Sequence, residues 1–109
     1  MNKKELNFIL QEGEGLKIEF KESFDKSLAR EIVALANAVG GRIFLGIDDR
    51  NKLKGVTDSN KLKSQVQDLA RKCDPKITLS FETAVYEGRE ILIVEVAEGE
   101  DKPYQCSFG

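Results

Sequence analysis

The segment GGRIFLGIDD, residues 40–49, constrains the fold more than any other part of the chain. It contains the run IFLGI, in which apolar residues do not alternate with polar ones. Such a run is typical of a central strand that is covered on both faces. The two glycines before it are suited to ending a helix, and Asp48-Asp49 followed by Arg50-Asn51 has the chemistry of a turn. We therefore expect a sheet with packed structure on both of its faces.

Two segments with helical periodicity are expected to pack on this sheet. The first covers about residues 26–39, and its wide apolar stripe predicts that much of it is buried. We expect Asn37, on this helix, to be a hydrogen-bonded, buried amide and not a ligand. The second helix is expected to follow an N-cap at Asp58 or Ser59. It should end at Asp74-Pro75, because the residue before a proline avoids helical geometry.

Alternation of apolar and polar residues predicts further strands. In GLKIEFKES, residues 15–23, the side chains of Leu16, Ile18 and Phe20 are expected on one face and the charged side chains on the other. Near the C-terminus, Glu87-Gly88-Arg89 predicts the turn of a hairpin. The order β-α-β-β-α-β-β indicates a single compact α+β domain, with two main helices on a mixed β-sheet. The expected strands are residues 16–21, 43–47, 53–56, 77–82 and 91–96.

Charge is unevenly distributed along a chain whose net charge is −2. Residues 50–76 carry eight cations and three anions, a net charge of +5, whereas residues 77–109 carry two cations and seven anions, a net charge of −5. A locally basic segment attracts phosphates even in a slightly acidic chain. Arg50, Lys52 and Lys54, on a predicted hairpin, would contact phosphates without reading bases. The alternative is an ordinary solvated helix face and hairpin.

The cysteine and histidine content limits the chemistry available. The chain has two cysteines, Cys73 and Cys106, and no histidine, so we expect no zinc site, and the commonest general base is missing. Both cysteines are expected to be reduced packing or surface thiols. No apolar run approaches the ~20 residues that span a bilayer, and the first residues lack the apolar core of a secretory signal. We therefore expect a cytoplasmic protein without a membrane partner.

Acidic residues are spaced so that they would converge at one end of the sheet. Glu14 and Glu19 flank the first predicted strand, and Asp48-Asp49 end the central one. If these strands are neighbours, as strands joined by one helix often are, their carboxylates suit Mg²⁺ or Mn²⁺, which prefer oxygen ligands. The alternative is that Glu19 pairs with a nearby lysine on a solvated strand face and that the two aspartates simply open a turn.

Three motifs resemble the Schlafen AlbA-like domain, a family described as DNA-binding. They are EGLKIEFK (Glu14 to Lys21), ALANAVGGRIFLGIDD (Ala34 to Asp49) and LKGV (Leu53 to Val56). The resemblance runs from about Glu14 to Tyr104 and implies a compact α+β unit. It divides the chain into an N-terminal lead-in (1–13), the Schlafen AlbA-like domain (14–104) and a truncated C-terminal end (105–109).

The resemblance also implies a biological setting and a site. Bacterial members usually carry the domain at the N-terminus of a longer regulator or helicase-like protein, so a further C-terminal domain is expected. Animal Schlafen proteins cleave RNA with three acids, which by motif fall on Glu14, Glu19 and Asp49, with Lys21 beside them. Those enzymes use two lobes and a zinc site, and this chain has one lobe and no counterpart of the zinc ligands. The family commonly continues beyond KPY to a Tyr-x-Arg-x-Gly segment, so this chain is expected to be a fragment.

Three functions follow as alternatives. The first is a nucleic-acid-binding domain, for DNA or RNA, in which Lys21, Arg50, Lys52 and Lys54 contact phosphates. The second is a metal-dependent endoribonuclease, in which Glu14, Glu19 and Asp49 hold Mg²⁺ or Mn²⁺ and a homodimer restores the second lobe. The third is an oligomerisation module without enzymatic activity, which would use the edge of the hairpin between residues 77 and 96. The sequence does not distinguish DNA from RNA.

Overall fold

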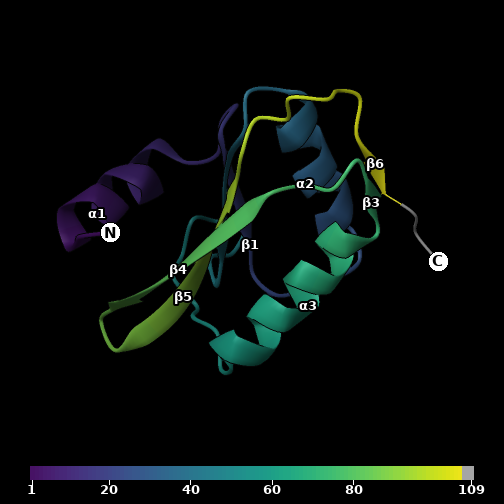
Figure 1. Cartoon of the computed structure of the whole chain (residues 1–109). Coiled ribbons are helices and arrows are strands. Elements are labelled where there is room, and N and C mark those ends of the chain that lie inside the picture. Colours follow the sequence, from purple (N-terminus) through teal and green to yellow (C-terminus); the bar gives the residue numbers. More distant parts are fainter. Residues whose placement is uncertain (107–109) are drawn as a thin grey trace.

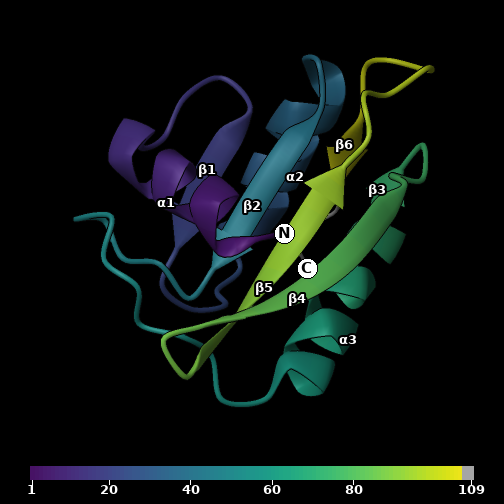
Figure 2. The same ribbon diagram turned by 90° about the vertical axis from the view of Figure 1, so that its left-hand side faces the viewer.

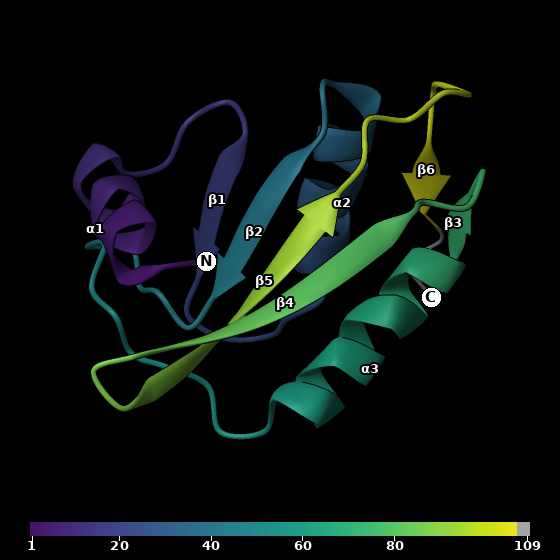
Figure 3. The same cartoon turned by 60° about the vertical axis from the view of Figure 1, so that its left-hand side comes forward.

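A four-stranded mixed sheet with the order β1-β2-β5-β4 organises the chain (Figure 3). The computed structural model describes residues 1–106, so the last three residues of the predicted C-terminal end lie outside it. The α+β class expected from the sequence is confirmed. The elements are α1 (Lys3–Glu12), β1 (Ile18–Lys21), α2 (Leu28–Asn37), β2 (Gly41–Leu45), α3 (Ser59–Arg71), β3 (Cys73–Asp74), β4 (Leu79–Tyr86), β5 (Arg89–Val96) and β6 (Gln105–Cys106).

The central strand is β2, as the apolar run predicts. It pairs in parallel with β1 and antiparallel with β5. Helices α2 and α3 lie on one face of the sheet and α1 lies on the other (Figure 1). Ile43 and Leu45 point into the cluster under α2 and α3, whereas Phe44 points into the cluster under α1. Both faces of the strand are therefore covered, which explains why its sequence does not alternate.

The N-terminal helix α1 is amphipathic and short. The side-chain oxygen of Asn2 caps it by accepting a hydrogen bond from the backbone N–H of Glu5 at 2.8 Å. Leu6 and Ile9 are buried against the sheet, over Phe44 and residues of β5. Figure 2 shows α1 in front of β1 and β2. The lead-in is thus part of the fold, because it covers apolar side chains that would otherwise face water.

Two strand predictions were wrong in part. β1 begins at Ile18 and not at residue 16, because the backbone N–H of Gly15 bonds to the carbonyl of Ile18 at 3.1 Å and closes a tight turn. Leu16 lies in that turn and is 76% exposed, so it does not share the buried face of Phe20. The return strand expected at 53–56 is reduced to one bridge between Ile47 and Leu53.

The region after the second helix differs from expectation. α3 starts as predicted, with Asp58 accepting a hydrogen bond from the backbone N–H of Lys61 at 3.0 Å. It ends at Arg71, earlier than Asp74-Pro75, because residues 73–74 leave the helix to pair with β6. This pairing places Cys73 opposite Cys106, and the two form a disulfide. The expectation of two reduced thiols was therefore wrong.

The C-terminal hairpin is confirmed. Glu87 and Gly88 both have positive φ angles, 53° and 75°, which is the geometry of a tight hairpin turn between β4 and β5. β4 is an edge strand and contributes to both hydrophobic clusters. Its first half packs Leu79 and Phe81 against the cluster under α2 and α3, and its second half packs Ala84 and Tyr86 against the cluster under α1.

No helix within residues 1–106 is long and apolar enough to cross a membrane.

Candidate functional site

An open hollow of about 440 Å³ lies along the outer edge of β1. Its walls come from the segment before β1, from β1, from the β1–α2 connection, from α2 and from the loop after β2. Acidic side chains predominate in it, so its chemistry is that of a carboxylate cluster with one lysine. The lining residues are Glu14, Glu19, Phe20, Lys21, Glu22, Ser23, Asp25, Glu31 and Asp49.

The strand β1 brings two charged side chains into this hollow. Glu19 and Lys21 are two residues apart and therefore lie on the same side of the strand. Phe20, between them, is only 6% exposed and its side chain packs in the cluster under α1. The alternation of GLKIEFKES therefore does more than solvate one face, because it directs an acid and a base into one hollow.

Lys21 is held by side chains from the β1–α2 connection and from α2. Its Nζ donates a hydrogen bond to Ser27 Oγ at 2.8 Å and lies 3.4 Å from Asp25 Oδ2 and 3.5 Å from Glu31 Oε1. The lysine side chain is only 18% exposed. Its charge is therefore already balanced within the hollow, and it is not a free surface cation.

Glu14 and Glu19 form a carboxyl pair. Burial is the main cause that raises the pKa of Glu19 to about 7, and a hydrogen bond with Glu14 and the charges of Glu14 and Glu31 add to it, while Lys21 opposes it. Glu14 Oε2 also accepts a hydrogen bond from the backbone N–H of Phe20 at 3.4 Å. The neighbouring Glu14 therefore favours the protonated form of Glu19.

Glu31, on α2, is a member of the hollow that the sequence analysis missed. One of its oxygens faces Lys21, and the other, Oε2, is buried without a hydrogen-bond partner among the described residues. Burial raises the pKa of this carboxyl group, and Lys21 lowers it. The sequence did contain a signal for Glu31. It lies four residues before Leu35, beside the apolar stripe of the helix, and a charged side chain at such a position needs a partner.

The two aspartates after β2 have different roles. Asp48 Oδ1 accepts hydrogen bonds from the backbone N–H groups of Arg50 at 2.8 Å and Lys52 at 2.9 Å, and these bonds lower the pKa of Asp48. Asp48 therefore builds the turn. Asp49 is exposed and lines the hollow, so it is the second aspartate that joins Glu14 and Glu19.

The carboxylates of the hollow are not gathered into a set of metal ligands among the described residues. No group of three acidic, histidine or cysteine side chains within residues 1–106 is arranged to hold a metal ion. Glu14 and Glu19 are within hydrogen-bonding reach of each other, but Asp49 contributes to the same hollow without completing a set of ligands. The carboxylate oxygens have the chemistry that Mg²⁺ or Mn²⁺ prefers, whereas their present arrangement does not fit such an ion.

The predicted phosphate-binding cations are not gathered in this hollow. Of the four, Lys21 alone lines it. Lys54 Nζ lies 3.9 Å from Asp48 Oδ2, on the turn after β2. Arg50 and Lys52 are exposed on the same turn, and neither forms an ion pair within the described residues. The structure therefore separates an acid-lined hollow from a basic turn.

Residues 14–108 match the family described as Schlafen, AlbA_2. The chain belongs to the Schlafen AlbA_2 family. The match begins at Glu14, so α1 lies outside the matched residues of this AlbA_2 domain. The family assignment suggested by the EGLKIEFK, ALANAVGG and GIDD motifs is thereby confirmed.

Solved structures share the fold of this AlbA_2 domain. One is the N-terminal domain of a protein from Nitrosomonas europaea that is described as related to the ATP-dependent DNA helicase RecG; the TM-score is 0.75, the identity is 24%, and the match covers 96% of this chain and 77% of that one. Another is the DIP2311 protein of Corynebacterium diphtheriae, with a TM-score of 0.63 and 18% identity. This chain covers 22% of that protein, and 93% of this chain is matched. At these identities the likeness concerns the fold. Among curated proteins, none matches the chain.

Proposed function

We propose that this chain is a nucleic-acid-binding domain of a larger bacterial protein, a transcriptional regulator or a helicase-like protein of the cytoplasm. Its partner is DNA or RNA. The AlbA_2 family supports the proposal, as does the fold shared with the N-terminal domain of a RecG-related protein. That relative is an N-terminal domain, which supports a further C-terminal domain in this protein.

The observation that carries the proposal is the state of the cations between residues 50 and 76. Two of the eight form ion pairs within the described residues: Lys54 with Asp48, and Arg71 with Asp68. The others form no ion pair within residues 1–106, although acids outnumber bases in the whole chain. The charge of Lys52 does lower the pKa of Asp48, and Lys63 lies over the ring of Phe81. Unpaired surface cations exchange their counterions for phosphates at low cost, which favours a polyanion. They are Arg50, Lys52, Lys61, Lys63, Lys72 and Lys76.

The proposed contacts differ among the predicted residues. Arg50 and Lys52 are exposed on the turn after β2 and are placed to bind phosphates directly. Lys54 would do so by exchanging Asp48 for a phosphate. Lys21 is enclosed by Asp25 and Glu31, so its contribution depends on the protonation of those acids. Contacts of these side chains with the phosphate backbone of a nucleic acid confer affinity without sequence preference.

Salt dependence of binding tests the proposal. We expect labelled duplex DNA or RNA to bind at low salt, and the slope of log affinity against log salt to be reduced by about one for each phosphate contact removed. The variant is Arg50→Gln with Lys52→Gln. The control is Lys4→Gln with Lys26→Gln, which removes the same charge from exposed positions outside the basic segment. Negligible affinity of the wild type for both nucleic acids at low salt would refute the proposal.

A second candidate function is a metal-dependent endoribonuclease. It is favoured by the presence of Glu14, Glu19 and Asp49 in one hollow with Lys21. These acids would hold Mg²⁺ or Mn²⁺ after Asp49 approaches the glutamates, and the ion would supply charge stabilisation at the scissile phosphate. Zinc has no place in this candidate. A homodimer would provide the second lobe that the animal enzymes use.

Cleavage of labelled RNA in the presence of Mn²⁺ or EDTA distinguishes this candidate from binding alone. We expect metal-dependent cleavage that Glu19→Gln and Asp49→Asn abolish and that Glu12→Gln, an exposed acid at the end of α1, leaves intact. Cleavage that persists in Glu19→Gln would show that the acid-lined hollow does not carry it.

A further inference from the structure

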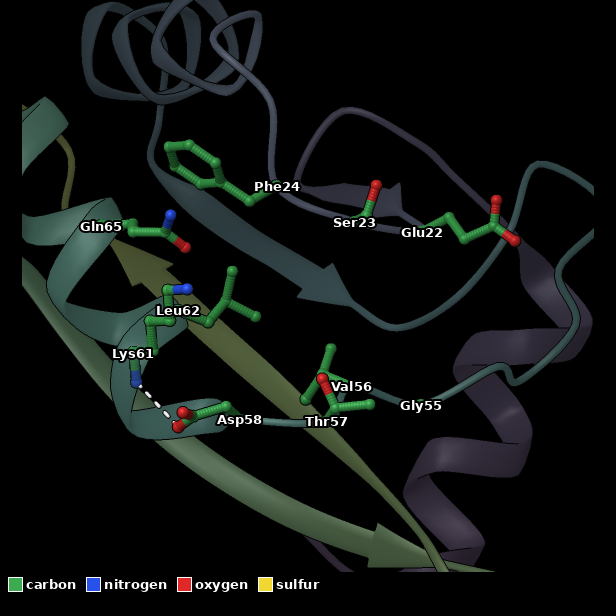
Figure 4. Close-up of a pocket in the computed structure, with 10 residues that line it drawn as sticks. All are labelled: Glu22, Ser23, Phe24, Gly55, Val56, Thr57, Asp58, Lys61, Leu62 and Gln65. Atoms are coloured by element: carbon green, nitrogen blue, oxygen red, sulfur yellow. Dashed lines mark hydrogen bonds between the residues drawn. The ribbon is translucent and has the colours of Figure 1, made fainter.

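A second hollow, of about 330 Å³, adjoins the acid-lined hollow. Figure 4 shows the residues that line it. Three segments surround it: the β1–α2 connection, the loop of residues 55–58, and the first turns of α3. Glu22 and Ser23 line both hollows, so the two form adjacent compartments on one side of the molecule. Neither the carboxylate cluster nor the basic turn accounts for this second space.

The base of the second hollow is apolar and firmly supported. Phe24, from the β1–α2 connection, lies across the hollow from Val56 and Leu62 (Figure 4). Leu62 is 8% exposed and belongs to the cluster under α2 and α3, and Phe24 and Val56 pack against that cluster. A flat apolar ligand placed here would contact an aromatic ring and two branched aliphatic side chains. Because these side chains are part of the core packing, the hollow is preformed and does not need to open.

The rim of the second hollow carries polar side chains that have no partner among the described residues. The side chains of Ser23, Thr57, Lys61 and Gln65 line the hollow, and none has a hydrogen-bond or ion-pair partner among the described residues. Asp58 differs, because its carboxylate is occupied by the backbone N–H of Lys61. The hydroxyl groups of Ser23 and Thr57 and the amide of Gln65 can each donate and accept hydrogen bonds, as the edge of a heteroaromatic ring requires. The ammonium group of Lys61 can bind a phosphate.

We propose that this hollow binds one unpaired base of a single-stranded nucleic acid, with Lys61 on the adjoining phosphate. This inference rests on the proposed nucleic-acid binding and names the form of nucleic acid. Phe24 stacks on or packs against the base, and Gln65 and Thr57 bond to its edge. A base within a duplex cannot enter, because its faces are stacked and its edge is paired, whereas single strands are recognised by such stacking platforms.

Matched variants test this assignment. Affinity is measured by fluorescence anisotropy at one fixed low salt concentration, for a labelled single-stranded decamer and for the duplex of the same sequence. We expect Phe24→Leu to lower single-strand affinity about tenfold and to leave duplex affinity unchanged. Its control is Phe8→Leu, on the exposed face of α1. Lys61→Gln is compared with Lys4→Gln, which removes the same charge from an exposed position outside the basic segment.

A further pair guards against loss of packing in Phe24→Leu. Gln65→Ala is compared with Gln67→Ala, since both are half-buried on α3 and Gln67 does not line this hollow. We expect Gln65→Ala to weaken single-strand binding and Gln67→Ala to have no effect. If the wild type binds nucleic acid and each variant behaves as its control, the base-binding assignment is wrong and nucleic-acid binding stands. If the wild type binds neither form, both are wrong.

Discussion

The side-chain amide of Asn37 forms two hydrogen bonds with the backbone of Tyr104. Its Nδ2 donates to the Tyr104 carbonyl at 3.0 Å, and its Oδ1 accepts from the Tyr104 N–H at 2.6 Å. The end of α2 is thereby joined to the segment that follows β5, and Tyr104 is only 7% exposed. The expectation that Asn37 is hydrogen-bonded is confirmed, whereas the expectation that it is buried was wrong, because it is half-buried. Its role in the ALAN motif is structural.

Replacing this amide should destabilise the domain markedly. In Asn37→Ala the N–H and carbonyl of Tyr104 lose their partners in a partly buried place, and we expect the free energy of unfolding to fall by about 2–3 kcal/mol. Urea denaturation measures the change. Asn60→Ala, at an exposed position on α3, should change it by less than about 0.5 kcal/mol. Equal effects in the two variants would contradict the structural role.

The glycine after α2 is required for steric reasons as well as for its backbone angle. Gly40 has a φ of 77°, and a Cβ there would lie 2.7 Å from both the Val96 carbonyl oxygen and the Glu98 nitrogen. Gly88 has a nearly equal φ of 75° but nothing within 4 Å of a Cβ. We expect Gly88→Ala to cost about 1 kcal/mol, the cost of the left-handed conformation. Gly40→Ala should cost about 3 kcal/mol or more, and thermal unfolding of the pair separates the two causes.

The pKa of Glu19 predicts a pH dependence of stability. Its value is about 7 in the folded protein and 4.5 without its environment. The folded state therefore holds a proton that the unfolded state has lost between these values, and its stability falls as the pH rises through this window. We expect the melting temperature of the wild type, relative to Glu19→Gln, to decrease from about pH 4.5 to pH 7. Glu14→Gln should narrow this pH range, because Glu14 is one of the groups that raise the pKa of Glu19. A difference that does not vary with pH would contradict the carboxyl pair.

The disulfide between Cys73 and Cys106 predicts a redox dependence of stability. It joins residues separated by 33 positions. Closing such a loop lowers the conformational entropy of the unfolded chain and so stabilises the folded protein by about 3–4 kcal/mol. Reduction of the oxidised protein should therefore shift its urea midpoint to lower concentration. Cys106→Ala should be insensitive to the reductant, and a wild type that is equally insensitive would show that the bond does not form in solution.

Local patterns in the sequence were sufficient for some elements. The apolar run identified β2, Asp58 identified the start of α3, and Glu87-Gly88 identified the hairpin turn, because each signal lies within a few adjacent residues. Leu16 was misplaced because apolar alternation does not reveal the turn that Gly15 closes with Ile18. Periodicity describes a strand only where the backbone is extended.

Features that depend on contacts distant in sequence were not predictable in this way. The pairing of Cys73 with Cys106 depends on where β6 returns to the end of α3. The inclusion of Glu31 in the acid-lined hollow depends on how α2 packs against β1, which a helical pattern does not specify. The motif did place Glu14, Glu19 and Asp49 in one hollow, whereas it gave no sign that Lys21 would be enclosed by acids.

The strand β4 serves as a wall for two cores, since Leu79 and Phe81 face one cluster and Ala84 and Tyr86 face the other. A hairpin that formed one residue out of step would turn all four side chains to the wrong faces. Both hydrophobic clusters would then lose their contacts with β4 at the same time. Neither cluster would keep contacts that stabilise the shifted alignment. In the folded domain, the correct alignment of this hairpin is therefore favoured by both clusters together and not by either one alone.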